Sequence, residues 1–190
     1  MDFFDYAIGK TLPLEGGYSN NPNDRGRETK CGITEAIFRD ALKWRIISGV
    51  NSVKDLTDDQ IKIIYRTLYW QPIRLNEVED KEIAAEIFDT SVNSGPGKAT
   101  LIAQLALDYL GEKLTVDGVM GSITIGLINK WCRKDPRALF VCLNGFQFIH
   151  FVAIVDGDLI EEIQKRVKSD ASQSTFSRGW TKRIQDYRHT

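Results

Sequence analysis

Three side chains in one short loop could carry out acid–base chemistry: Glu15, Asp24 and Thr29. Glu15 follows residues 2–12, whose apolar spacing predicts a helix, and it lies next to Leu14. The negative end of the helix dipole and the apolar surroundings both favour the protonated form of a carboxyl group. Glu15 is therefore suited to act as a general acid near neutral pH.

Asp24 lies nine residues later in a polar segment of turn formers, where a carboxyl group is expected to stay ionised. Thr29 is neutral and could hold a water molecule for attack. Two carboxyl groups in contrasting surroundings are typical of glycosidic cleavage. From residue types alone a second interpretation stays open: Glu15 is a surface acid after a helix, and Asp24 closes an Asx turn.

The same loop carries a long, irregularly spaced pattern: Glu15-Gly-Gly-Tyr18, Asp24-x-Gly26 and Thr29-x-x-Gly32-Ile33-Thr34. It resembles the signature of the glycoside hydrolase 108 family, N-acetylmuramidases of phages and bacteria with a lysozyme-like fold. The resemblance implies that Glu15 is the catalytic acid. The order of acids is also similar to the catalytic trio of phage lysozymes, which implies that Asp24 and Thr29 handle the nucleophilic water.

The pattern departs from the family at two positions of the loop. Arg27 stands where the family usually has a second glycine after the Asp, and Cys31 replaces an aromatic or polar residue. Arg27 could alter the shape of the loop or contact an anionic group of the substrate. Arg27 is the feature that favours a protein that binds the peptidoglycan of the bacterial cell wall without cleaving it.

Five further residues are predicted to bind substrate: Tyr18, Asn20, Trp70, Asp89 and Asn93. Trp70 belongs to a Tyr-x-x-x-Tyr-Trp pattern that recurs in the family, although a Trp at a helix end is more often a core residue than a sugar platform. Asp89 and Asn93 are four residues apart, hence on one helix face, where they could contact the amide groups of a sugar. The alternative for Asn93 is a role in ending the helix, together with Gly95.

The helical spacing of apolar residues predicts a mainly α fold. The family resemblance implies that the fold is of the α+β lysozyme-like kind, with an irregular or β-hairpin loop over residues 17–33. The family signature covers residues 1–92, and residues 93–190 resemble a peptidoglycan-binding helical segment. No linker separates them, so we expect one compact body. The predicted helices span 2–12, 35–47, 57–72, 79–94, 96–110, 122–134, 136–156 and 158–168. The helix over 136–156 is apolar nearly all round and is predicted to be the central buried helix.

In the second segment, Asp117-Gly-x-x-Gly121-x-x-Thr124 resembles the core motif of small peptidoglycan-binding modules. The glycines predict a tight turn, and Asp117 or Ser122 is expected to cap the following helix. The run lacks the alternating oxygen ligands of a calcium loop.

Charge, cysteine spacing and the apolar stretches of the sequence exclude several other classes of function. The 190 residues carry a net charge of −1, so the chain has no basic surface for nucleic acid. Three scattered cysteines give neither a disulfide framework nor zinc spacing, and no metal or organic cofactor is implied. The most apolar stretch is shorter than a membrane span, so no integral membrane segment is predicted. The N-terminus lacks the features of a signal peptide, which predicts synthesis in the cytoplasm and release to the periplasmic wall by a holin, lysis or a secretion system.

The sequence therefore predicts a bacteriolytic, endolysin-like muramidase that binds the glycan strands of peptidoglycan and hydrolyses the β-1,4 bond between N-acetylmuramic acid and N-acetylglucosamine; it leaves the oligomeric state open. A separation of roughly 6.5–9.5 Å between the two carboxyl groups would indicate inversion, and ~5 Å retention. The alternative is a non-catalytic wall-binding protein, since some relatives carry the label secretion activator. A peptidase lacks support because no zinc set or Cys–His pair is present.

Overall fold

The computed structural model describes residues 2–20, 28–158 and 161. Asp24, Arg27 and most of the predicted helix over 158–168 lie outside the described residues, so the predictions made for them stay predictions. The α-helices are α1 (Phe3–Thr11), α2 (Glu35–Lys43), α3 (Asp58–Tyr65), α4 (Lys81–Ser94), α5 (Pro96–Tyr109), α6 (Ser122–Lys134) and α7 (Pro136–Val155). Short helical turns are η1 (Leu12–Leu14), η2 (Val53–Asp55), η3 (Arg66–Trp70, a π-helix), η4 (Gln71–Ile73) and η5 (Leu75–Glu77). The strands are β1 (Tyr18–Asn20), β2 (Glu28–Lys30) and β3 (Ile33–Thr34). The predicted mainly α fold is confirmed.

Side-chain caps start most of the helices where the sequence predicts a start. Thr57 and Gln60 form a reciprocal capping box at α3, and the Thr34 side chain accepts a hydrogen bond from a backbone N–H of α2. Asp135 caps α7, whose first residue is Pro136. Proline is favoured there because the first N–H of a helix has no partner within the helix.

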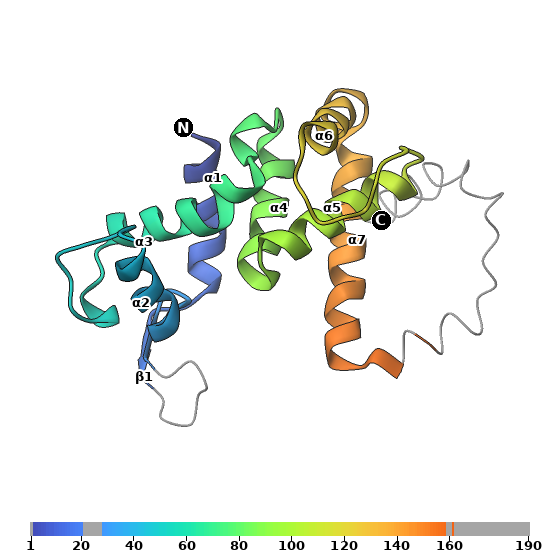
Figure 1. Cartoon of the computed structure of the whole chain (residues 1–190). Helices are drawn as coiled ribbons and strands as arrows, with labels where there is room; N and C mark the ends of the chain where they lie inside the picture. The colour runs from blue at the N-terminus through green and yellow to red at the C-terminus, as the bar shows by residue number, and fades with distance from the viewer. Residues whose placement is uncertain (1, 21–27, 159–160, 162–190) are drawn as a thin grey trace, which may run out of the picture.

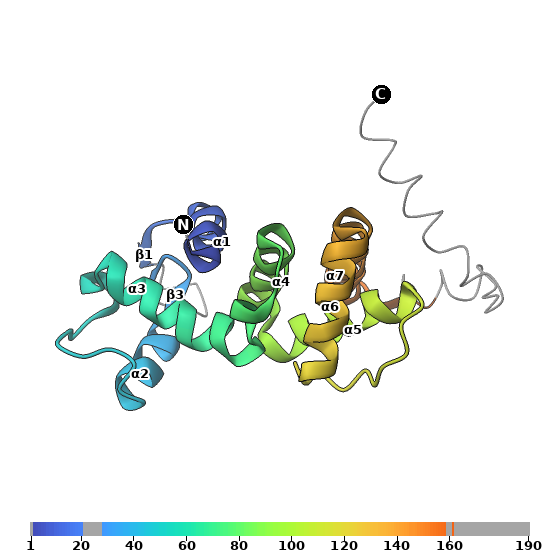
Figure 2. The same ribbon diagram turned by 90° about the horizontal axis from the view of Figure 1, so that it is seen from above.

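Helices α1, α4 and α7 lie side by side, with α4 in the middle, and α3 and α5 run across them (Figures 1 and 2). The centre of the core is an aromatic cluster in which the rings of Phe4, Trp70 and Phe88 meet edge to face at 5.5–5.7 Å. The core continues from α1 to Leu143 of α7, so the two sequence segments share one hydrophobic core.

The predicted hairpin is a three-stranded antiparallel sheet in the order β1-β2-β3. A two-residue turn, Cys31-Gly32, joins β2 to β3, and both residues have positive φ, +48° and +73°. Positive φ at both turn positions matches the right-handed twist of the flanking strands. Lys30 fixes the sheet to the neighbouring segment by donating to the carbonyl oxygens of Lys54 and Leu56 at 2.8 and 2.7 Å.

Helix α7 corrects one expectation, because it is buried only along its first half. Buried residues end at Gln147, whereas Phe148 is 68% exposed and Val155 is 86% exposed. The second half projects past the helices that cover the first (Figure 1). Among the described residues α7 is the one helix long and apolar enough to cross a membrane by length and composition alone, a criterion that core helices also meet.

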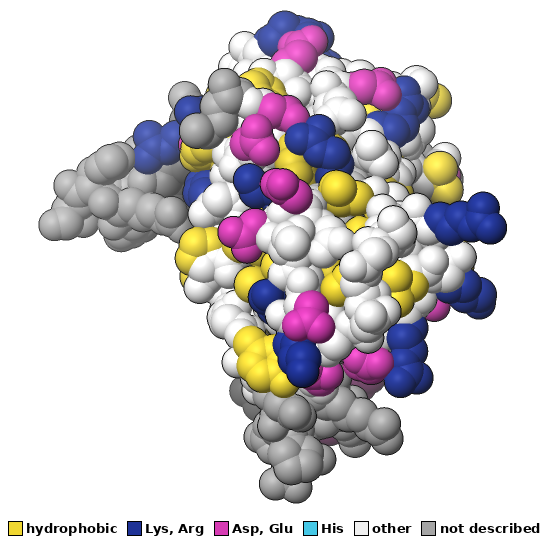
Figure 3. Space-filling model, turned by 90° about the vertical axis from the view of Figure 1, so that its left-hand side faces the viewer, with side chains coloured by type: hydrophobic (Ala, Val, Ile, Leu, Met, Phe, Trp, Pro, Cys, Tyr) yellow, Lys and Arg dark blue, Asp and Glu magenta, His cyan; other side chains and the backbone are white. Residues whose placement is uncertain are grey.

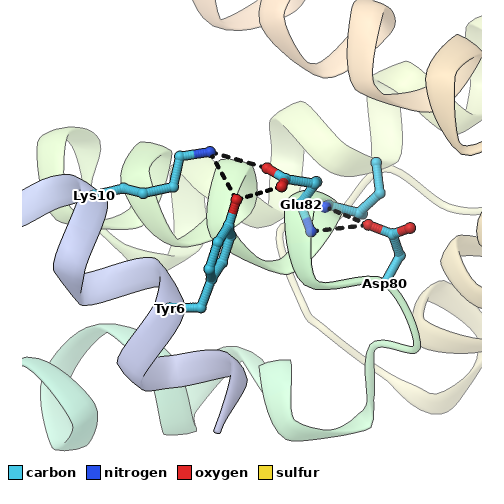
Figure 4. A network of polar contacts seen from close by, with 5 residues as sticks. Tyr6, Lys10, Asp80 and Glu82 are labelled. Atoms are coloured by element: carbon cyan, nitrogen blue, oxygen red, sulfur yellow. Dashed lines mark hydrogen bonds and ion pairs between the residues drawn. The ribbon is translucent and has the colours of Figure 1, made fainter. Parts of the chain in front are cut away.

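Polar contacts also join α1 to α4 at the surface. Tyr6 donates to Glu82, Lys10 donates to the other carboxylate oxygen at 2.9 Å, and Asp80 caps the first turn of α4 (Figure 4). On the face shown in Figure 3, basic and acidic side chains are intermixed and neither sign dominates. The contacts of Tyr6 and Lys10 with Glu82 help to fix the position of α1, the helix that leads to Glu15.

Candidate active site around Glu15

Glu15 lies directly after the η1 turn that ends α1, as the sequence predicts. Pro13 is the second residue of this turn, which leads the chain from the helix toward the sheet. The side chain is half-buried, and its carboxylate makes no hydrogen bond or ion pair with any residue that the structure describes. An acid of this kind keeps its oxygens available to a ligand.

The Glu15 carboxylate lies against the backbone of Gly32 in the turn between β2 and β3. A Cβ atom at position 32 would stand 2.5 Å from Glu15 Oε2 and 2.7 Å from Tyr65 Oη. Only glycine fits here, both for space and because φ is +73°. The glycine three residues after Thr29 thus allows the acid and the sheet to meet.

Two tyrosines form the wall on the other side of Glu15. Tyr65 ends α3, Tyr69 lies in the π-helical turn η3, and their ring centroids are 5.5 Å apart. The Tyr65 hydroxyl donates to the carbonyl of Cys31 at 2.7 Å, which ties the turn to α3. Burial and, second, the nearby Glu15 carboxylate raise the pKa of both tyrosines, so they remain neutral hydroxyl groups.

Burial raises the pKa of Glu15, and the charge of Asp89 raises it further. Both effects disfavour the ionised form, which matches the predicted role of a proton donor. The sequence suggested the helix dipole and apolar neighbours as causes. In the structure, two causes raise the pKa of this carboxyl group. The first is desolvation, to which the sheet turn and the tyrosines contribute, and the second is the charge of Asp89.

Asp89 comes from the middle helix α4 and is held by donors from three helices. Thr11 donates to Oδ1 at 3.4 Å, and Asn93 and Gln147 each donate to Oδ2 at 3.3 Å. Asp89 and Asn93 share one helix face, as their spacing predicts. Asn93 folds back along α4 instead of capping it, and Gly95, with φ +85°, ends the helix.

The remaining predicted site residues in the loop lie in the sheet. Tyr18 is 49% exposed and donates to Glu28 at 2.9 Å. Thr29 is half-buried in the central strand, where its register partners are Ser19 and Thr34. Asn20 ends β1. The strand that carries Thr29 therefore continues into the turn that contacts Glu15. Substrate binding by Tyr18 and Asn20 stays a prediction.

Trp70 corrects another prediction, because it does not reach the surface. Its side chain is 0% exposed in the aromatic core, and its indole N–H donates to Asn76 at 2.5 Å. A fully buried ring with its only donor satisfied is a packing residue. The two tyrosines of this motif, Tyr65 and Tyr69, lie near Glu15, whereas Trp70 does not.

A cavity of about 220 Å³ adjoins the site between α1, α4 and α7. Its lining includes Leu14, Thr11 and Asp89, together with Glu86, which lies one turn before Asp89. Burial raises the pKa of Glu86 to about 7, while a hydrogen bond from Asn144 acts in the opposite direction. Sequence reasoning missed Glu86, Thr11 and Gln147, because their proximity to Asp89 depends on how three helices pack.

The glycine-rich loop of the second segment is organised by Gln104, a buried residue of α5. Its side-chain amide donates to Asp117 at 2.9 Å, and its oxygen accepts from the N–H groups of Asp117 and Gly118 at 3.0 and 2.8 Å. The prediction that Asp117 or Ser122 caps α6 is wrong: Gly121 is the cap residue and no side chain bonds there. A cavity of about 580 Å³ lies beside this loop.

Comparison with protein families gives a match over the part of the chain that builds this site. Residues 8–95 match the family described as Glycosyl hydrolase 108. This segment belongs to glycosyl hydrolase 108. The matched range contains Glu15, the sheet, both tyrosines and Asp89, and it identifies a glycoside hydrolase. The resemblance predicted from the Glu15–Thr34 pattern is confirmed for this segment.

The solved structures include 12 matching chains. One is the structure of Brucella abortus SagA, with 27% sequence identity and a TM-score of 0.61. The alignment covers 98% of this chain and 91% of SagA. The likeness therefore extends beyond the family match into the second helical segment. No curated protein matches the chain.

Proposed function

We propose that this protein is a muramidase that hydrolyses the β-1,4 bond between N-acetylmuramic acid and N-acetylglucosamine in peptidoglycan. The observation that carries the proposal is the Glu15 carboxyl group. It is half-buried against Gly32 and Tyr65, its pKa is raised by burial, and no described residue neutralises it. A carboxyl group in this state can donate a proton to the oxygen of a leaving sugar.

Asp24 and Thr29 are proposed to act on the attacking water, as the resemblance to phage lysozymes implies. Thr29 lies two residues before the turn that contacts Glu15, which supports a position near the reacting bond. An inverting reaction requires room for a water between the acid and the second carboxylate, whereas a retaining one brings the two carboxyl groups closer. The substrate class is proposed to be the glycan of the cell wall, reached after release from the cytoplasm.

The direct test is digestion of purified peptidoglycan, followed by mass spectrometry of the products. Wild type is expected to release glycans with a reducing-end N-acetylmuramic acid. Glu15→Gln keeps the shape of the side chain but removes the acid, so the rate should fall by roughly 10²–10⁴-fold. Glu79→Gln is the matched control, because Glu79 is an exposed glutamate paired with Arg133.

Other product patterns would contradict the proposal in distinct ways. Reducing-end N-acetylglucosamine would assign cleavage to the other glycosidic bond. Absence of cleavage together with co-sedimentation of the protein with the wall would favour the non-catalytic, secretion-associated alternative. Equal cleavage by wild type and Glu15→Gln would remove Glu15 from the mechanism.

A further inference from the structure

Asp89 is the point at which the second segment of the chain reaches the Glu15 site. Its carboxylate accepts hydrogen bonds from Thr11 of α1, from Asn93 of its own helix and from Gln147 of α7. Gln147 lies 52 positions beyond residue 95, where the family match ends. The surroundings of Asp89 are therefore completed by a part of the chain that the glycoside hydrolase segment does not include.

Gln147 is unusual for its position in α7. This helix has no charged side chain between Arg137 and Asp156, and Gln147 is 9% exposed at the end of its buried stretch. Burying an amide group is unfavourable unless it finds hydrogen-bond partners. The Nε2 group of Gln147 has such a partner in Asp89 Oδ2, at 3.3 Å.

We propose that Gln147 is a positioning residue, which holds the Asp89 carboxylate in place beside Glu15 so that the second segment of the chain completes the active site. The proposal rests on the function proposed above. Thr11 and Gln147 approach Asp89 from the two helices that flank α4, so the carboxylate is held from both sides. Without the donor on α7, Oδ2 keeps only the donor Asn93 of its own helix, so the carboxylate is held less firmly beside Glu15. The charge of Asp89 would then act on Glu15 less strongly.

Several other titratable groups face Asp89 and Glu15 and must be separated from this effect. From α7, the neutral amides of Gln147 and Asn144 form hydrogen bonds with Asp89 and Glu86, while His150 contacts Ser94 at 3.2 Å. Glu86 changes charge near pH 7 and so within the range of the experiment. The others are Lys10 from α1, Glu82 from α4, Tyr65 from α3 and Tyr69 from η3.

The experiment follows the titration of the Glu15 carboxyl group by ¹³C NMR in the full-length protein. Wild type is compared with Gln147→Leu, Asp89→Asn and the double variant, and Glu15→Gln assigns the signal. Removing the Asp89 charge should lower the midpoint of Glu15 by about half a pH unit or more, and Gln147→Leu should lower it in the same direction. Because Gln147 acts through Asp89, the double variant should match Asp89→Asn alone.

Two controls separate positioning from packing. Ser94→Ala removes a different contact between α4 and α7, so it should leave the Glu15 midpoint unchanged. The same set in a Glu86→Gln background should show the same shifts, since the nearby acid no longer titrates. An unchanged Glu15 midpoint in Gln147→Leu, or additive shifts in the double variant, would overturn the proposal.

The rate of glycan hydrolysis against pH, measured in parallel, separates the two proposals. The basic limb of the profile should follow the NMR midpoint in each variant; about half a pH unit corresponds to roughly a threefold loss of rate on that limb. If the midpoint shifts as expected but wild type releases no glycan, the proposed function fails and the positioning role stands. If wild type is active and the basic limb of the pH profile has the same midpoint in Gln147→Leu as in wild type, the positioning role alone fails.

Discussion

The polar side chains of two glycine-containing loops, the one that meets Glu15 and the one around Asp117, are in opposite situations. In the second segment, Gln104 and Asp117 satisfy each other and the backbone of the loop, and the hydrogen bond from Gln104 lowers the pKa of Asp117. In the first, Glu15 meets a glycine backbone and two tyrosine rings, and burial raises its pKa. The first loop disfavours the ionised form of its carboxyl group and leaves the group without a described hydrogen-bond partner, whereas the second uses its carboxylate to hold a turn.

This comparison shows how a polar cluster that stabilises the fold differs from one that can take part in a reaction. A buried polar network in which each group has a partner stabilises one conformation. A partly buried acid that no described residue neutralises retains a free energy cost in its ionised form, and its proton is available to a substrate. Residue types alone do not distinguish the loops, because both stretches of the sequence combine Asp, Gly and Thr.

The largest expected effect is a loss of activity when one methyl group is added to the first loop, compared with the same addition to the second loop. Gly32→Ala would displace the ends of the Glu15 and Tyr65 side chains, so hydrolysis should fall by at least about 10²-fold. Positive φ should cost a further ~1–2 kcal/mol of stability. Gly118→Ala is the matched control: its φ is +75°, and the new Cβ would meet Leu101 at 3.3 Å.

Gly118→Ala should lose stability to a similar extent but retain the rate per folded molecule. The measurements are urea unfolding and glycan release at equal folded concentration. Similar rate losses in the two variants would show that the contact between Gly32 and Glu15 has no special role.

The next effect is on stability alone and concerns the network in the second loop. Gln104→Leu keeps the volume of a buried side chain but leaves the N–H groups of Asp117 and Gly118 without their acceptor. We expect a loss of about 3 kcal/mol in the free energy of unfolding, since each orphaned donor costs ~1–3 kcal/mol. Gln71→Leu, at an exposed glutamine, should change stability by less than about 0.5 kcal/mol.

Glycan release by folded Gln104→Leu should stay near the wild-type rate. A specific loss of activity, with stability unchanged, would mean that this loop takes part in the reaction and that the contrast between the loops is wrong.

A smaller, pH-dependent effect is expected at Glu86. Its pKa is raised from 4.5 to about 7 by burial, so the folded state binds a proton that the unfolded state has released between these values. The free energy of unfolding should therefore decrease as pH rises from about 4.5 to 7, by on the order of 2 kcal/mol. Glu86→Gln should lose less stability over this range, as measured by unfolding at pH 5 and pH 8. An identical pH dependence in both proteins would contradict the burial of this carboxyl group.

Much of the fold follows from local signals in the sequence. The capping box at Thr57, the Asp135-Pro136 helix start and the stop at Gly95 each depend on residues within one turn of the helix, so their spacing is sufficient. The family signature likewise places Glu15 after a helix and before a hairpin. These features are encoded by neighbours in the chain.

The misses have a common physical cause, because each depends on tertiary packing. Trp70 is placed in the core by rings from α1 and α4, and α7 loses its cover after Gln147. Gln104 stands 13 residues before Asp117, with nothing in the intervening sequence to mark the contact. The contact between Glu15 and Gly32 also requires the sheet to fold onto the helix end.

The measurement that tests the central claim most directly is the rate of glycan hydrolysis as a function of pH, in wild type and in Glu86→Gln. If burial keeps Glu15 protonated for catalysis, the basic limb should have a midpoint clearly above the ordinary glutamate value of about 4.3, and Glu86→Gln should retain a limb above that value. A limb at the ordinary value, or one that disappears with Glu86→Gln, would contradict the assignment of Glu15 as the acid.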